Sequence, residues 1–182
     1  LEKRKDAGFE AMVSTARPEA SRIGVEILRQ GGNAVDAAVA VGFAIGVAEP
    51  ATSGIGGGGF MTIKTAEMRE AVCIDFREFS PSKAYPGMWV FDTSGRVKDS
   101  ENSIGAKSVA VPGEVAGFVE VLERYGTMDL EDVIAPSIAL AESGIVVSPM
   151  MARMMNDFRP CLEKFPDTRR IFLNRGKGFS PG

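Results

Sequence analysis

The feature that most constrains the fold is a segment from Ala34 to Ala48 that is apolar on nearly every side. Asn33 can cap a helix over this segment, and Asp36 stands three residues later, where its side chain can reach back to the cap. A helix without a polar face must be covered on all sides. Its uncharged stretch, residues 37–48, has twelve residues, fewer than the roughly 18 that indicate a membrane span. We therefore expect a central buried helix and no membrane-spanning segment.

Signals for further helices and strands lie on both sides of this segment. Proline at a first helical position, glycine just past a helix end and short apolar runs between turn residues mark the boundaries. In chain order, we expect a strand at 11–15, a helix that Pro18 opens and Gly31 and Gly32 stop, a hairpin of strands at 60–65 and 71–75, a surface loop over 82–107, a strand at 109–111, a helix at 114–125, a helical stretch to Ser143 that Asp129 caps and Pro136 kinks or splits, a helix from Ser148 and a strand at 171–173. The pattern predicts an α/β (α+β) fold, and the length of 182 residues fits one domain over residues 1–182.

The composition is that of a folded chain and excludes several kinds of chemistry. The 21 Lys and Arg against 24 Asp and Glu give a net charge of −3, which does not favour nucleic acid as a partner, since phosphate binding needs a basic surface. There is no histidine, so the chain holds no Ser-His-Asp system and no imidazole metal ligand. Cys73 and Cys161 form no CxxC pair and are expected to be buried thiols, whose separation the sequence leaves open. We expect no metal and no cofactor.

The glycines gather in one segment, Gly54–Gly59, which reads GIGGGG and is called the glycine-rich segment below. It fits the letters of GxGxxG, but it follows an expected helix and precedes an expected strand, whereas the dinucleotide-binding motif needs the reverse order. Two interpretations stay open. The glycines can serve a sharp turn against which another backbone packs, or Gly56, Gly57 and Gly58 can form a wall of backbone N–H groups that lines a ligand site.

Charged side chains follow the second strand of the expected hairpin, where Asp75, Arg77 and Glu78 stand close together. An arginine there can present its planar guanidinium to a carboxylate through two parallel hydrogen bonds. The alternative is a local ion pair of Arg77 with Asp75 or Glu78. No serine or threonine stands in a recognisable pattern with a general base, so the residues by themselves indicate no catalytic nucleophile.

Several stretches of the sequence together resemble one family. They are, in order, MVSTARPEASRIGVEILRQGGNAVDAAVA, VAEPATSGIGGGGF, IDFREFSP, VAVPGEVAGF and APSIALAESG, and FLNRGKGFSPG near the end is similar to a further family segment. Each stretch alone is a weak signal, but five in this order resemble the large subunit of the γ-glutamyltransferase (γ-glutamyltranspeptidase) family, from about Met12 onward.

The resemblance implies an N-terminal-nucleophile hydrolase with an αββα sandwich, made as a precursor that cuts itself into a large and a small subunit. The nucleophile of such a protein is a threonine at the new N-terminus of the small subunit, with its own α-amino group as base. Arg77 occupies the place of the family arginine that binds the α-carboxylate of the γ-glutamyl donor. The resemblance thus favours substrate binding by Arg77, with Glu78 and the glycines as the candidate site wall.

The resemblance also implies that this chain is an incomplete portion of the sandwich. It ends at Gly182, before a family large subunit ends, and has no small-subunit sequence, so we expect it to need that partner for catalysis. Alternatives are an acylase or amidase, an enzyme that processes poly-γ-glutamate, or a non-catalytic scaffold. Family members are often exported; the chain begins at Leu1 without a basic-then-apolar leader, and its compartment stays open.

Overall fold

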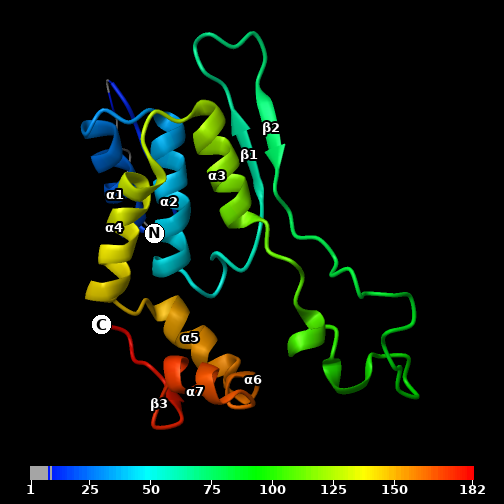
Figure 1. Cartoon of the computed structure of the whole chain (residues 1–182). Helices are drawn as coiled ribbons and strands as arrows, with labels where there is room; N and C mark the ends of the chain where they lie inside the picture. The colour runs from blue at the N-terminus through cyan, green and yellow to red at the C-terminus, as the bar shows by residue number, and fades with distance from the viewer. Residues whose placement is uncertain (1–7, 9) are drawn as a thin grey trace. The chain divides into compact units, whose positions relative to one another are not determined.

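The computed structural model describes Gly8 and residues 10–182, which form two compact units (Figure 1). The first unit contains the described residues of Leu1–Arg77 together with Gly113–Ile145. The second contains Glu78–Pro112 and Val146–Gly182. Both units combine helices with a two-stranded antiparallel sheet, so the expectation of mixed α and β structure is confirmed. One domain over residues 1–182 stays a prediction.

The helices of the first unit surround one apolar helix, as the sequence predicts. They are α1 (Pro18–Arg29), α2 (Ala34–Ala48), α3 (Glu114–Tyr125) and α4 (Leu130–Ser143). The central helix α2 packs against each of the other three, and Figure 1 shows it in the middle of this group. Val39, Ala40 and Ala44 on α2 are fully buried. Small residues let the neighbouring helices approach, which explains why a helix with no polar face is stable here.

As predicted, a capping box begins α2. Its Asp36 side chain also accepts hydrogen bonds from residues far along the chain, which the sequence does not indicate. The Asn33 side chain accepts hydrogen bonds from the helix N–H groups, and Asp36 Oδ2 accepts from Asn33 N at 2.7 Å. Asp36 also accepts from Thr127 N at 2.9 Å, Thr127 Oγ1 at 2.6 Å and Met128 N at 3.2 Å. The fully buried carboxylate therefore joins the start of α2 to the connection between α3 and α4.

These contacts also set the charge state of Asp36. Burial by itself raises the pKa of this carboxyl, because water no longer stabilises its charge. Hydrogen bonds from Thr127, Asn33 and Met128 outweigh that effect and hold the pKa of Asp36 below its usual value. Asp36 is ionised in the folded protein at neutral pH. Its negative charge interacts favourably with the positive N-terminal end of the α2 dipole.

The expected hairpin is present, with strands β1 (Phe60–Ile63) and β2 (Val72–Asp75) paired antiparallel so that Phe60 lies opposite Asp75. Burial alternates along both strands: Ile63 is buried in the core, whereas Phe60 is exposed. Alternation places successive side chains on opposite faces, so one face of the hairpin packs on the helices.

The expectation of buried thiols was wrong. Cys73 is exposed and Cys161 is half-buried, and both are free. Cys73 lies on the face of β2 turned away from the core, because its neighbours in the strand take the inward positions. The two cysteines belong to different units.

The second unit consists of short elements. They are the 3₁₀ turns η1 (Lys98–Ser100) and η2 (Ala106–Ser108), the helices α5 (Pro149–Asp157), α6 (Arg159–Leu162) and α7 (Pro166–Phe172), and the strands β3 (Leu173–Asn174) and β4 (Lys177–Gly178). Ser148 caps α5 through a hydrogen bond from Met151 N to its Oγ at 3.1 Å. The strand expected at 171–173 begins only at Leu173, because residues 171 and 172 complete the last turn of α7.

Three other expectations need correction. Residues 11–15 have no regular structure, since no neighbouring strand pairs with their backbone in the described part of the chain. The strand expected at 109–111 is reduced to a single bridge between Val111 and Phe79. Helix α4 is not split at Pro136 but continues through it, and the alternative of a kink at that residue stays a prediction.

Candidate substrate-binding site

Residues 49–53 connect α2 to the glycine-rich segment, and tight turns lie in both stretches. Glu49 forms the C-cap of α2, and its carbonyl oxygen accepts a hydrogen bond from Thr52 N at 3.1 Å. Gly54 then has a φ of +148°, a conformation that residues with a side chain rarely adopt. Gly57 N donates to Gly54 O at 2.9 Å, which closes the turn.

The carbonyl oxygens of Gly57 and Gly59 accept hydrogen bonds from other parts of the first unit. Gly57 O accepts hydrogen bonds from Gly113 N and Glu114 N, both at 3.0 Å, at the first turn of α3. Gly59 O accepts from Phe76 N at 3.0 Å, next to the end of β2. The segment is thus fixed on one side by the start of α3 and on the other by the end of the hairpin.

Arg77 lies beside this segment. It is the residue that follows Phe76 after the end of β2; it is exposed, and its Nη1 donates a hydrogen bond to Gly58 O at 3.3 Å. Its backbone N donates to Asp75 Oδ1 at 3.0 Å, so this carboxylate is engaged with the main chain of Arg77. The structure therefore brings together Arg77, Gly57 and Gly58, three of the residues that the sequence singled out.

The other two candidate wall residues are Gly56 and Glu78. Gly56 is exposed, and a Cβ atom placed on it would have no heavy atom within 4 Å outside its chain neighbours. Glu78 is half-buried and is the first residue of the second unit. Their participation in the wall stays a prediction.

Phe76, the residue before Arg77, belongs to a buried cluster of three aromatic rings. The ring of Phe76 is 5.7 Å from the ring of Phe118, which lies 5.0 Å from the ring of Phe43, both in edge-to-face contact. All three side chains are buried. Since aromatic side chains bury large areas and have few rotamers, this cluster gives the residue before Arg77 a rigid support.

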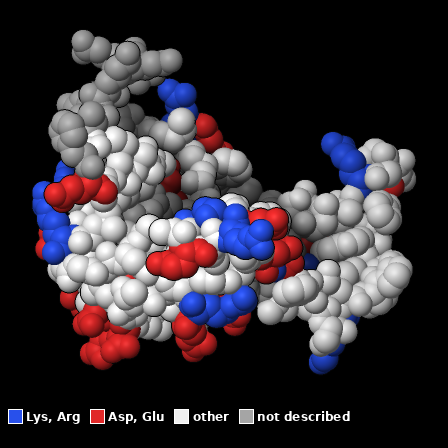
Figure 2. All heavy atoms as spheres, turned by 90° about the horizontal axis from the view of Figure 1, so that it is seen from above, with Lys and Arg blue, Asp and Glu red and all other residues white. Residues whose placement is uncertain are grey.

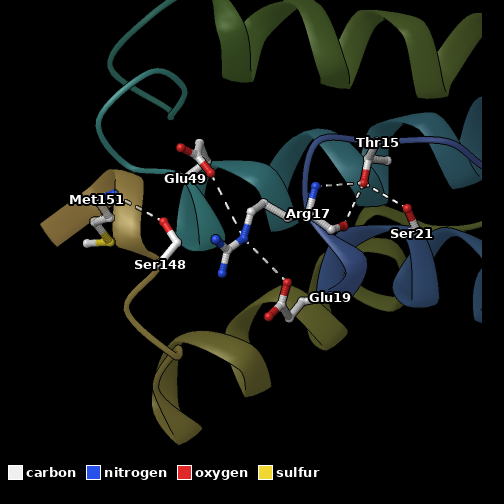
Figure 3. A network of polar contacts seen from close by, with 7 residues as sticks. All are labelled: Thr15, Arg17, Glu19, Ser21, Glu49, Ser148 and Met151. Atoms are coloured by element: carbon white, nitrogen blue, oxygen red, sulfur yellow. Dashed lines mark hydrogen bonds and ion pairs between the residues drawn. The ribbon is translucent and has the colours of Figure 1, made fainter. Parts of the chain in front are cut away.

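A network of charged residues that the sequence did not reveal lies at the C-terminal end of α2, a few residues before the glycine-rich segment (Figure 3). Arg17 Nε lies 3.5 Å from Glu19 Oε2 and 3.9 Å from Glu49 Oε2. The Arg17 side chain is only 12% exposed. Thr15 Oγ1 donates to Arg17 O at 2.6 Å and lies 2.8 Å from Ser21 Oγ. The one available signal was that Arg17 and Glu49 each precede a proline at an expected helix boundary.

Neither a cluster of metal-ligating side chains nor a membrane-spanning helix is present among the described residues. No group of three or more His, Cys, Asp and Glu side chains comes close enough to hold a metal ion within Gly8 and residues 10–182. None of the helices in that same part of the chain has both the length and the apolar character needed to cross a bilayer. Figure 2 shows acidic and basic side chains interspersed over the described part of one face.

The fold and the site define a class: a mixed α/β protein with a glycine-rich backbone segment held against an exposed arginine, an arrangement suited to binding a carboxylate. The sequence model of the family described as Gamma-glutamyltranspeptidase matches residues 20–182. The chain belongs to this family, which confirms the resemblance seen in the sequence.

Individual relatives agree with this assignment. The chain is 39% identical over 180 residues to a glutathione hydrolase proenzyme of Bacillus subtilis (strain 168), covering 99% of this chain and 30% of that protein. It is 42% identical over 186 residues to an acylase ACY 1 proenzyme of Pseudomonas sp. (strain SE83), covering 100% of this chain and 33% of that protein. The crystal structure of Helicobacter pylori gamma-glutamyltranspeptidase matches with a TM-score of 0.90 at 37% identity, covering 98% of this chain and 51% of that one.

The chain thus spans about a third of the length of these curated relatives and about half of the solved chain. The relatives include both a glutathione hydrolase and an acylase at similar identity. This portion of the sequence therefore shows the family without selecting the substrate.

Proposed function

We propose that the whole protein transfers γ-glutamyl groups from glutathione or a related γ-glutamyl amide to water or an amino acid. The observation that carries this proposal is the hydrogen bond from the Arg77 guanidinium to Gly58 O, in a chain of the γ-glutamyltranspeptidase family. The α-carboxylate of a γ-glutamyl donor can accept from the guanidinium in the two-bond geometry that arginine favours.

The chemistry belongs to the small subunit, which is the partner this proposal requires. A threonine hydroxyl at its N-terminus attacks the γ-carbonyl carbon of the donor, with the proton passing to the threonine α-amino group. The amide C–N bond then breaks, the amine leaves with that proton, and an ester to threonine remains. Water or an amino acid attacks the ester and releases glutamate or a new γ-glutamyl amide. Arg77 contributes orientation of the donor, which fixes the carbonyl near the hydroxyl.

The same proposal places the two units within a larger αββα sandwich of the N-terminal-nucleophile type. The exposed face of the hairpin supports this, because Phe60 there is 63% exposed and an edge or face of this kind is normally covered by further structure.

The test is Arg77→Ala and Arg77→Lys in the full-length precursor. Arg77 is exposed in this chain, and we expect the bound donor and the rest of the protein to cover it. Loss of one partner of such a covered charge pair costs about 2–5 kcal/mol, so the donor KM of Arg77→Ala should rise about 30-fold or more. Arg77→Lys should recover only part of this, because lysine lacks the planar fork. Self-cleavage should continue in both variants.

Arg124→Ala is the matched control. Arg124 is half-exposed on α3, where it pairs with Glu120 at 3.0 Å, and surface pairs of this kind contribute little. Its donor KM should stay at the wild-type value. Unchanged donor kinetics in Arg77→Ala would refute donor binding by Arg77.

A second candidate function, an acylase or amidase, is favoured by the 42% identity to the acylase ACY 1 proenzyme. A panel of acyl donors with and without a free α-carboxylate separates the two, because a γ-glutamyl specialist should lose turnover when the carboxylate is removed. The mass of the full-length product before and after incubation separates either enzyme from a non-catalytic scaffold, since only self-cleavage gives two fragments.

A further inference from the structure

The first turn of α3 lies unusually close to the end of the hairpin. A Cβ atom placed on Gly113 would lie 2.2 Å from Phe76 O and 3.1 Å from Arg77 O. One placed on Gly117 would lie 2.3 Å from Phe76 Cγ and 2.5 Å from Phe76 Cβ. Real Cβ atoms essentially never come within 3.0 Å of such neighbours. Both positions must therefore be glycine for α3 and the chain at Phe76 to lie as they do.

Backbone conformation does not explain these two glycines. Gly113 has a φ of −110° and a ψ of −14°, which residues with side chains also adopt. Gly117 lies inside α3, where glycine is the weakest helix former after proline. The close approach to Phe76 is the remaining physical reason for both.

The same turn of α3 also holds the glycine-rich segment. Gly113 N and Glu114 N both donate to Gly57 O at 3.0 Å. Phe76 N donates to Gly59 O at 3.0 Å. The start of α3 thus touches both parts of the candidate site: the segment that accepts the Arg77 hydrogen bond and the backbone that carries Arg77.

We propose that Gly113 and Gly117 are positioning residues for the carboxylate of the donor. By admitting the Phe76 backbone and side chain against α3, they fix the distance between the Arg77 guanidinium and the glycine-rich segment. A methyl group at either position moves Phe76, and with it Arg77, away from that segment. The inference rests on the proposed function, since it concerns the same carboxylate.

The experiment uses Gly113→Ala and Gly117→Ala in the full-length precursor with two donors. The first donor is γ-glutamyl-4-nitroanilide; the second is 4-aminobutanoyl-4-nitroanilide, the same acyl group without its α-carboxylate. We expect KM for the first donor to rise about tenfold or more, with a smaller change in kcat, and KM for the second to change less than twofold. Where the second donor turns over too slowly, inhibition constants of glutamate and 4-aminobutanoate give the same comparison.

Gly24→Ala is the matched control for an added methyl group. Gly24 lies in α1, and its added Cβ would meet the Val41 and Val13 side chains at 2.7 and 2.9 Å, away from Phe76. This variant introduces similar crowding in the same unit. Both of its KM values should match those of the wild-type protein.

Phe76→Leu alters the contact between Phe76 and α3 by changing Phe76 instead of the glycines, and it adds no atoms. It therefore tests the inference if Gly113→Ala and Gly117→Ala fail to fold or self-cleave. It should raise KM selectively for the donor with the carboxylate. Equal changes for both donors, or no change, in the folded variants would overturn the inference. If Arg77→Ala discriminates between the donors and these variants do not, the inference alone fails; if Arg77→Ala does not discriminate, the proposed function fails.

Discussion

The Asp36 carboxylate offers a sharp test of how the first unit is held together. In Asp36→Asn, the remaining amide oxygen can still accept from Thr127 N and Met128 N, which lie 2.9 and 3.2 Å from Asp36 Oδ1. The new NH₂ group takes the place of Oδ2 and faces Asn33 N, a donor at 2.7 Å, which loses its partner. Thr127 Oγ1 can rotate its hydroxyl and accept instead.

The expected cost follows from these contacts. One polar group left without its partner costs about 1–3 kcal/mol, and loss of a negative charge at a helix N-terminus costs about 0.3–1 kcal/mol. Asp36→Asn should therefore lower the free energy of local opening around α2 by about 1.3–4 kcal/mol. Hydrogen exchange measures this at the amides of Asn33, Thr127 and Met128, where protection should fall most. Asp132→Asn, in the first turn of α4, is the control and should leave these amides unchanged.

The effect should also depend on pH with a defined sign. The folded pKa of Asp36 lies below its unfolded value, so the unfolded chain binds a proton first as the pH falls. The stabilisation by Asp36 is therefore complete above the unfolded pKa, about 3.9, and is lost as the pH falls through the lower folded pKa. The difference between wild type and Asp36→Asn should shrink in that window. Equal protection of the three amides in both proteins at neutral pH would refute this account.

Two further predictions concern the residues in Figure 3. Arg17→Gln leaves the Glu19 and Glu49 carboxylates close together with little solvent, and should destabilise the first unit by about 1–3 kcal/mol. The cost is smaller than for a fully buried pair, because all three side chains keep some exposure. Arg29, whose side chain is 75% exposed, provides the control: equal denaturant midpoints for Arg17→Gln and Arg29→Gln would contradict this prediction. Ser148→Ala removes the cap of α5 and should cost about 0.5–2 kcal/mol, seen as faster hydrogen exchange at Met151 N, whereas Ser148→Asp should preserve it.

Much of the first unit could be predicted because its signals are local. The capping box at Asn33, the apolar helix after it and the hairpin between turn residues each depend on neighbours within a few positions. The predictions that failed depended on distant partners. Residues 11–15 have the composition of a strand but no strand beside them, and Cys73 is apolar enough for a core but lies on the outer face of β2.

For the candidate site, too, the sequence revealed local features but not contacts between distant residues. The residue types of the glycine-rich segment and Arg77 were visible in the sequence, but two interpretations of each stayed open. The contact between Arg77 and Gly58 joins residues 19 positions apart, and no pattern of neighbours predicts it. Arg17 was missed because its acidic partner Glu49 lies at the far end of another helix.

The sequence by itself determined that the first unit contains four helices and a hairpin, roughly where they start, and which family the chain resembles, because caps, turns and apolar periodicity act over a few residues. Only the tertiary structure decided that Asp36 joins the start of α2 to the distant connection between α3 and α4, that Gly113 and Gly117 admit Phe76, and that Arg77 meets the glycine-rich segment. These contacts come from packing between distant segments, whose free energy depends on the shapes that meet rather than on the order of residues along either one.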